Sequence, residues 1–238
     1  QPPLSLFGER EDFDKLTPAD VKEFYNDFYT SSQCEIVLSG NYSEDFIKEL
    51  EKYFGKESWG KKTSNQDLID YTISIENSNK AQLKTINKPS AAQASIRMGC
   101  VGLNHRREDF LPFSVVVCLL GGYFGSRLMM NIREDKGYTY GISANLFAYK
   151  YASVLSIAAD VKADKAQETL DEIEKEIIIL QNDLVSENEL SQVKNYLIGD
   201  CIRSLDGAFD KADKYSYLKK IECQYDYYKN FINTIKTI

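Results

Sequence analysis

Two stretches of the chain, LLGGYFGSRL at residues 119–128 and NIREDKGYTYG at residues 131–141, carry the features on which the interpretation of this sequence depends. Glycines crowd the first stretch, at the end of an expected buried helix. A short helix is expected over residues 126–134, followed by a turn at Gly137 and a strand that begins near Thr139. The two stretches are therefore expected to join a layer of helices to a sheet.

The elements on either side alternate between helical and strand spacing of apolar residues. Helices are expected after the cap at Thr17, over 46–54, over 110–120, over 163–182 and after the capping box Ser186–Glu189, and strands over 36–38, 71–76, 93–101, 139–147 and 152–160. Strands in two clusters, flanked by paired helices, predict an α+β fold with a mostly antiparallel sheet covered by helices.

Composition shifts divide the chain into three parts. Residues 1–55 are expected to form a helix, a strand and a helix, residues 56–70 are rich in Lys, Ser, Thr, Asn and Gly and are expected to be a linker, and residues 71–238 are expected to form a second domain. The chain opens with Gln-Pro-Pro rather than Met and stops inside an expected helix, so both ends are interpreted as cuts in a longer polypeptide.

The overall composition excludes several classes of protein. Of 238 residues, 43% are hydrophobic, and 36 acidic against 29 basic side chains give a formal charge of -7. This balance argues against nucleic-acid binding, and no apolar run approaches the roughly 20 residues that span a bilayer. Five cysteines without close pairing are typical of a reducing compartment, so a cytoplasmic location is expected.

The sequence does not contain the ligands that a catalytic zinc site needs. Its one histidine, His105, lies in a polar stretch and is interpreted as a solvated loop residue. The motifs H-x-x-E-H and H-E-x-x-H are absent, and the cysteines never approach a C-x-x-C spacing. No metal site within this chain is therefore expected, and a histidine-dependent nucleophilic triad is excluded on the same ground.

The glycine cluster from Gly121 to Gly125 has three interpretations. It can be a tight turn between helices, a phosphate-binding loop, or a place where an extended peptide approaches the backbone. It lacks the Lys-Ser/Thr of a P-loop and follows a helix rather than a strand, which favours the turn over phosphate.

Arg133 and Tyr140 are the candidate catalytic pair. They lie on either side of the expected Gly137 turn, so their side chains can converge on one cleft. A guanidinium and a phenol there can donate hydrogen bonds to a carbonyl oxygen and stabilise negative charge that develops on it. The alternative is structural: an arginine near the end of a helix and a tyrosine at the edge of the core.

The two quoted stretches together resemble the pitrilysin/insulinase family of zinc metallopeptidases, the inverzincins. A glycine-rich turn, Ser-Arg-Leu, and then Ile-Arg-Glu-x-x-Gly-x-x-Tyr form a long and specific pattern. Residues 17–55 are similar to the end of the family's first domain, and residues 186–205 to a helix of its second. The resemblance covers most of the chain.

In this family two α+β domains face each other like a clamshell, so the resemblance implies that this chain forms one half of the clamshell. One domain carries the zinc motif, and the other supplies an Arg and a Tyr seven residues apart, a spacing that Arg133 and Tyr140 match. Zinc is therefore expected in a missing or partner domain, and an extended, unfolded peptide is the expected substrate. The residues expected to contact this peptide are Gly121, Gly122, Gly125 and Ser126.

Three functions remain open at this point. The chain can be the non-zinc half of a metalloendopeptidase and inactive alone, a non-catalytic scaffold subunit, or a simple peptide-binding module. A homodimer and a heterodimer are both open. A structural hypothesis accompanies the first: residues 15–55 dock onto residues 71–238 and complete one sheet in permuted order, because an incomplete sheet leaves backbone groups unpaired.

Overall fold

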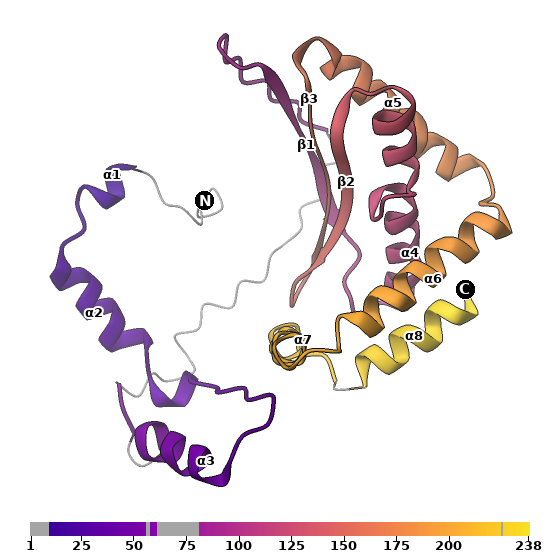
Figure 1. The fold of residues 1–238 in the computed structure, drawn as a ribbon. Coiled ribbons are helices and arrows are strands. Elements are labelled where there is room, and N and C mark those ends of the chain that lie inside the picture. The colour runs from indigo at the N-terminus through magenta and orange to yellow at the C-terminus, as the bar shows by residue number, and fades with distance from the viewer. Residues whose placement is uncertain (1–9, 56–57, 61–80, 225) are drawn as a thin grey trace. The chain divides into compact units, whose positions relative to one another are not determined.

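The computed structural model describes residues 10–55, 58–60, 81–224 and 226–238 (Figure 1). The chain divides into two compact units, Gln1–Ser74 and Ile75–Ile238, and each is described by itself. The predicted division into residues 1–55, a linker over 56–70 and a domain over 71–238 stays a prediction, as does the docking of the first part onto the last.

The described residues of the first unit form short helices. They are α1 (Arg10–Phe13), α2 (Pro18–Phe28), η1 (Ser31–Gln33), α3 (Glu44–Leu50) and the π-helix η2 (Glu51–Gly55). The predicted cap at Thr17 is confirmed, because its hydroxyl accepts the N–H of Asp20 at 3.3 Å, and the Asp20 carboxylate accepts the N–H of Thr17 at 2.8 Å. This reciprocal pair satisfies two backbone donors that the first turn of a helix leaves free.

The strand predicted over residues 36–38 is wrong. These residues have no regular secondary structure. A strand exists only when its backbone groups pair with a second strand, and the described residues of the first unit contain no other strand to pair with. The strand predicted over residues 71–76 lies outside the described residues.

The second unit is built on a three-stranded antiparallel sheet. Its strands are β1 (Gln93–Gly102), β2 (Thr139–Ala148) and β3 (Ser153–Lys162), in the spatial order β1-β3-β2. The predicted hairpin is confirmed: Tyr149 donates its N–H to the carbonyl of Ala152 at 2.8 Å and closes the turn between β2 and β3.

Helices cover one face of this sheet (Figure 1). The helices that pack on it are α4 (Phe110–Gly121), the π-helix η4 (Met129–Asp135) and α5 (Ala166–Asn182), with η5 (Ala163–Lys165) between β3 and α5. The chain continues through α6 (Glu187–Arg203), α7 (Ala208–Lys220) and α8 (Tyr227–Thr237). In Figure 1, α4 and α5 run along the same side of the strands. The predicted α+β class, an antiparallel sheet covered by helices, is confirmed.

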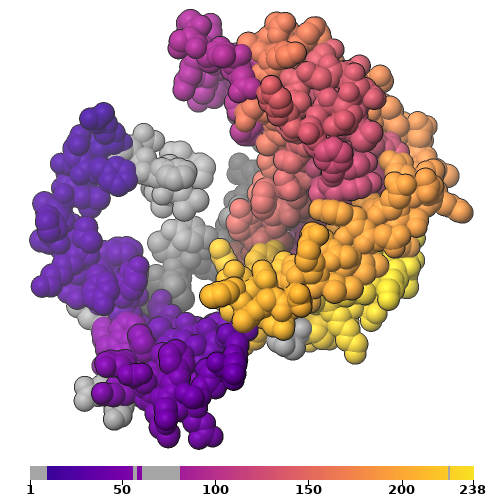
Figure 2. Space-filling view, viewed as in Figure 1, coloured from indigo at the N-terminus to yellow at the C-terminus, as the bar shows by residue number. Residues whose placement is uncertain are grey.

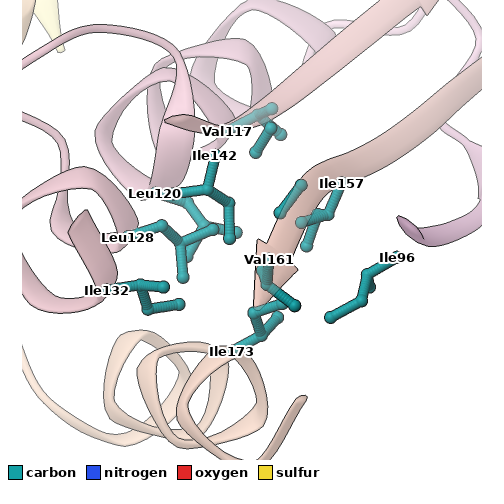
Figure 3. Close-up of a cluster of buried hydrophobic side chains, with 11 residues drawn as sticks. Ile96, Val117, Leu120, Leu128, Ile132, Ile142, Ile157, Val161 and Ile173 are labelled. Carbon is teal, nitrogen blue, oxygen red and sulfur yellow. The ribbon is translucent and has the colours of Figure 1, made fainter. Parts of the chain in front are cut away.

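The main core lies between the sheet and this helix layer (Figure 3). Alternate residues of each strand point into it, as the period of two requires. Its buried members are Ile96, Val117, Leu120, Leu128, Ile132, Ile142, Ala144, Ile157, Ala159, Val161 and Ile173. Burial of each large aliphatic side chain contributes about 1.5–3 kcal/mol, so these contacts are the chief attraction between the layers.

A second core cluster joins α4 to the C-terminal helices. Val115 and Leu119 of α4 pack with Val193 of α6 and Ile235 of α8, all of them buried. In the space-filling view, α7 and α8, coloured orange to yellow, continue the surface of the second unit (Figure 2). The last helix is thus held to the domain by its apolar side.

His105 is buried, so its interpretation as a solvated loop residue is wrong. Its Nδ1 lies 3.1 Å from the carbonyl oxygen of Tyr149, and its ring meets Phe110 edge-on. Because a carbonyl oxygen only accepts, the proton lies on Nδ1. The sequence hid this contact because Tyr149 is 44 residues away and reaches His105 only when the hairpin forms.

Gly121 sets the distance between the helix layer and the sheet. A Cβ at this position would lie 2.5 Å from the backbone nitrogen of Ala144 and 2.7 Å from its Cβ. Backbone cannot yield as a flexible side chain can. Only glycine therefore lets the end of α4 approach β2 this closely.

We expect Gly121→Ala to lower the free energy of unfolding by about 1–3 kcal/mol, because the added methyl group overpacks the contact with Ala144. Urea unfolding followed by circular dichroism measures the change. Gly199→Ala is the matched control, because a Cβ there meets nothing within 4 Å and lies inside α6, where alanine is favoured. Equal stability of Gly121→Ala and the wild type would contradict the packing argument.

The five cysteines differ in exposure and are expected to differ in reactivity. Cys34 and Cys100 are exposed, Cys118 and Cys201 are buried, and Cys223 is intermediate. Burial raises the pKa of the Cys118 thiol to about 12, so little reactive thiolate exists near pH 8. We expect iodoacetamide at pH 8 to label the two exposed thiols first and the two buried ones only after unfolding, as peptide mass spectrometry can show. Rapid labelling of Cys118 in the folded chain would contradict this order.

Candidate functional site

Arg133 lies on the π-helix η4, where its guanidinium is held by two neighbours. Its Nη1 is 3.4 Å from the Glu134 carboxylate, and its guanidinium carbon lies 4.8 Å from the centre of the Phe124 ring. A cation over an aromatic face gains electrostatic attraction without losing its hydrogen-bond donors. The side chain is still 33% exposed, so the donors reach solvent.

A left-handed turn at Gly137 connects η4 to β2. Gly137 has φ 64°, and its N–H donates to the carbonyl of Arg133 at 3.2 Å. The N–H of Tyr138 donates to the carbonyl of Ile132 at 3.0 Å. These bonds satisfy carbonyls at the end of the helix and send the chain directly into the strand. The predicted turn is therefore confirmed, and it fixes how the helix meets the strand.

Tyr140 lies in a bulge at the start of β2. The register shifts between Thr139 and Ile142, so two residues, Tyr140 and Gly141, lie opposite Asp160 of β3. Thr139 stabilises the bulge, because its hydroxyl donates to the carbonyl of Asp160 at 2.6 Å and accepts the N–H of Gly141 at 3.1 Å. Tyr140 is 90% exposed, so its phenol is free to meet a ligand.

The two predicted catalytic residues thus occupy neighbouring, directly connected elements. Arg133 and Tyr140 both reach solvent, and no hydrogen bond joins their side chains to each other. The alternative that Tyr140 packs at the edge of the core does not agree with its exposure. Their convergence on one cleft and their role in catalysis stay predictions.

The four predicted peptide-contacting residues have different surroundings. Gly121 is buried against β2, Gly122 ends α4 and packs on Cys118, and Gly125 is exposed beside the ring of Tyr123. The hydroxyl of Ser126 is buried and has no hydrogen-bond partner among the described residues. Close packing accounts for the first two glycines, and a peptide-binding role for these residues stays a prediction.

An ion pair that the sequence analysis missed anchors this loop. Arg127 donates two hydrogen bonds to the Glu189 carboxylate, at 2.7 and 2.9 Å, and both side chains are mostly buried. Hydrogen bonding to this carboxylate raises the pKa of Arg127. The predicted capping box is therefore half formed: Ser186 accepts the N–H of Glu189, while the carboxylate turns to Arg127.

A groove of about 550 Å³ separates η4 from α5. Asn131 crosses it and donates to Glu172 at 3.0 Å and to Glu176 at 2.7 Å, which lowers the pKa of Glu172. Lys136 completes the network at 3.2 Å from Glu172. Acidic and basic side chains are equally represented along the groove, and Arg133 and Tyr140 do not line it. The groove's polar groups therefore bind largely to one another.

The described residues do not fit a zinc ion. Among them, no group of three or more His, Cys, Asp or Glu side chains is arranged to hold a metal. The one histidine is buried and donates through Nδ1 to a backbone carbonyl. No step of metal chemistry is therefore assigned to this chain. Separately, no helix in the described ranges is long and apolar enough to span a bilayer, and the cytoplasmic location stays a prediction.

The second unit is thus an α+β sheet-and-helix domain that carries a partly exposed Arg133 and an exposed Tyr140 on a connected helix and strand. Residues 15–197 match a family model described as the peptidase M16 inactive domain, and the chain belongs to this family. The resemblance found in the sequence is thereby confirmed.

Several relatives and solved structures agree with this assignment. The chain is 27% identical over 210 residues to an uncharacterized zinc protease of Bacillus subtilis, covering 88% of this chain and 49% of the relative. It is 20% identical to a probable inactive metalloprotease of the same organism, covering 88% and 48%. The fold matches a peptidase M16 inactive domain from Pseudomonas fluorescens with a TM-score of 0.73 at 18% identity, over 98% of this chain and 54% of that one. The chain thus spans about half the length of these relatives.

We expect Gly137→Ala to lower the free energy of unfolding by about 1 kcal/mol, because an L-residue is strained at positive φ. A Cβ there meets nothing within 4 Å, so the loss measures backbone strain alone. Gly141→Ala is the matched control, with equal space and no positive φ. Urea unfolding compares the two, and an equal effect would contradict the assignment of strain to the turn.

Proposed function

We propose that this chain is the substrate-binding, non-zinc half of a zinc metalloendopeptidase that cleaves unfolded peptides, and that it is inactive alone. The observation that carries the proposal is the pairing of Arg133 and Tyr140. Arg133 is partly exposed and Tyr140 is exposed, and they lie on a helix and a strand joined by a single turn. Membership of a family described as an inactive peptidase domain supports a role in binding rather than in metal chemistry.

The two side chains supply hydrogen-bond donors of the kind that peptide hydrolysis needs. The guanidinium of Arg133 is always charged, and the phenol of Tyr140 donates one O–H. Donors aimed at the carbonyl of the peptide bond would orient it and stabilise the negative charge that develops on its oxygen during attack. Phe124 would hold the Arg133 guanidinium in place through the stacking contact at 4.8 Å.

The proposal requires a partner that carries the metal. A zinc-bearing domain of the same family would complete the site, either in the same polypeptide or in a separate subunit. Some of the relatives are called zinc proteases, and the chain spans about half of their length, which supports this arrangement. Whether the assembly is a homodimer or a heterodimer is left to experiment.

With the zinc-bearing domain present, we expect Arg133→Ala or Tyr140→Phe to lower peptide cleavage by about 10²-fold while zinc stays bound, by analogy with the loss of an oxyanion donor. Cleavage of an unfolded fluorogenic peptide and metal analysis of the purified complex measure the two properties. Arg203→Ala and Tyr53→Phe are matched controls, because both side chains are exposed and lie far from residues 133 and 140 in the sequence. Unchanged turnover in both test variants would remove the assigned roles.

A non-catalytic scaffold is the second candidate, and one comparison favours it. One relative is called a probable inactive metalloprotease, and it covers the same share of this chain as the zinc protease does. A scaffold would bind no peptide. A peptide-binding module without catalysis would bind peptide, and the Arg133→Ala variant would no longer bind it. Fluorescence anisotropy with a labelled unfolded peptide therefore separates the scaffold from the two candidates that bind peptide. Cleavage of the peptide with the zinc-bearing domain present separates those two from each other.

A further inference from the structure

The sheet of the second unit has one face that the main core does not use. Residues of β3 alternate between the core and this open face: Ile157, Ala159 and Val161 are buried, while Val154 and Asp160 are exposed. The paired strands follow the same alternation through their register. The open face therefore consists of cross-strand rows that can be read directly from the pairing.

These rows change in character along the strands. Nearest to Tyr140, Asp160 accepts hydrogen bonds from Ser95 at 2.7 Å and from Arg97 at 3.3 Å. The middle rows are Arg97–Ala158–Ser143 and Gly99–Ser156–Asn145. Their side chains are small or short and polar apart from Arg97, whose guanidinium donates to the carbonyl of Ala159 at 3.1 Å and to the Asp160 carboxylate. The last row, nearest to the hairpin, is Val101–Val154–Phe147. The open face of the sheet thus has a polar end near Tyr140 and an apolar end near the hairpin, separated by two rows of mostly small side chains.

We propose that the row Val101–Val154–Phe147, named here the apolar row, is a subsite for one apolar side chain of the extended peptide that Arg133 and Tyr140 hold. The inference rests on the proposed function and adds a substrate preference to it. The three side chains are 53%, 37% and 50% exposed. Covering them removes apolar surface from water, which is favourable in proportion to the area covered.

The size of the apolar row points to a side chain rather than to a folded partner. Phe147 is the one aromatic side chain of the three, and an aromatic side chain presents about 150–250 Å² when fully exposed. It is half exposed, and the two valines are smaller. A stable protein–protein interface needs about 800 Å² per partner. The middle rows are mostly small and polar, so they extend the apolar area little. They instead leave room for the backbone of an extended chain.

The spacing between the two ends fits a peptide strand. Asp160, which faces Tyr140 across the bulge, and Val154 of the apolar row are six residues apart on β3, or about 20 Å at the rise of a strand. A peptide that lies along the strands has the same rise. Its apolar side chain therefore lies about six residues from the peptide group at Tyr140, and peptides shorter than about seven residues cannot reach both.

The test measures binding of labelled nine-residue peptides by fluorescence anisotropy with the full chain. The host peptide contains only Gly, Ser and Asn, and one version carries a single Phe near one end. We expect the Phe version to bind about tenfold tighter than its Ser counterpart. Phe147→Ser should abolish this preference, while Phe209→Ser should keep it, because Phe209 is 88% exposed on α7 and outside the apolar row. Phe147 is on the surface, and equal urea midpoints would verify that the variant folds.

The possible outcomes distinguish failure of the apolar row from failure of the proposed function. If peptides bind but the preference for Phe is missing, or survives Phe147→Ser, the apolar row is overturned and the proposed function stands. If Phe147→Ser instead converts a dimer to a monomer in sedimentation, the row belongs to a second copy and the proposal is also overturned. If no peptide binds, the proposed function fails and the subsite fails with it.

Peptide length gives an independent check on the spacing. For the nine-residue Phe peptide, both Arg133→Ala and Phe147→Ser should weaken binding, because both contacts form at once. For a five-residue Phe peptide only one contact can form, so at most one of the two substitutions should matter. Equal affinity of the wild type for the two lengths would overturn the six-residue spacing.

Discussion

The close approach of α4 to β2 is the constraint on which the second unit depends. At Gly121 the helix backbone lies against Ala144 with no room for a Cβ. This contact brings the apolar side of the helix layer within reach of the alternating strand residues and lets the main core form (Figure 3). Because the helices that pack on the sheet occupy one face, side chains on the other face, such as Val101 and Phe147, stay exposed. The same constraint therefore stabilises the domain and leaves one face of its sheet open.

Local backbone features then position the candidate site on this framework. A π-helix, a left-handed glycine and a bulge follow one another within thirteen residues, from 129 to 141. Each departs from regular structure, and such departures persist only where surrounding contacts hold them. Here Ile132 is buried in the core, Thr139 bridges the bulge and Phe124 stacks on Arg133. The partly exposed guanidinium and the exposed phenol are consequently carried on a helix and a strand that these contacts hold in place.

Much of the fold was predictable because its signals are local. The cap at Thr17, the alternation of β1, the turn at Gly137 and the helical spacing of α5 all depend on residues close together in the chain. The strand over residues 36–38 failed because strand formation depends on a partner that its own sequence does not describe. The capping box at Ser186 was half right, since the competing partner of Glu189 is an arginine 62 residues away.

The sequence by itself determined the family and the identity of the candidate pair, because a specific pattern of residue types over positions 119–128 and 131–141 encodes them. It also determined the α+β class, because the spacing of apolar residues distinguishes helices from strands along the chain. Only the tertiary structure decided which side chains are exposed and which strand residues share a row. The side chain of Tyr140 is exposed to solvent and that of His105 is buried, although both lie among polar neighbours in the sequence. The apolar row joins Val101, Val154 and Phe147 across three strands, and such a grouping exists only once the register of the sheet is set.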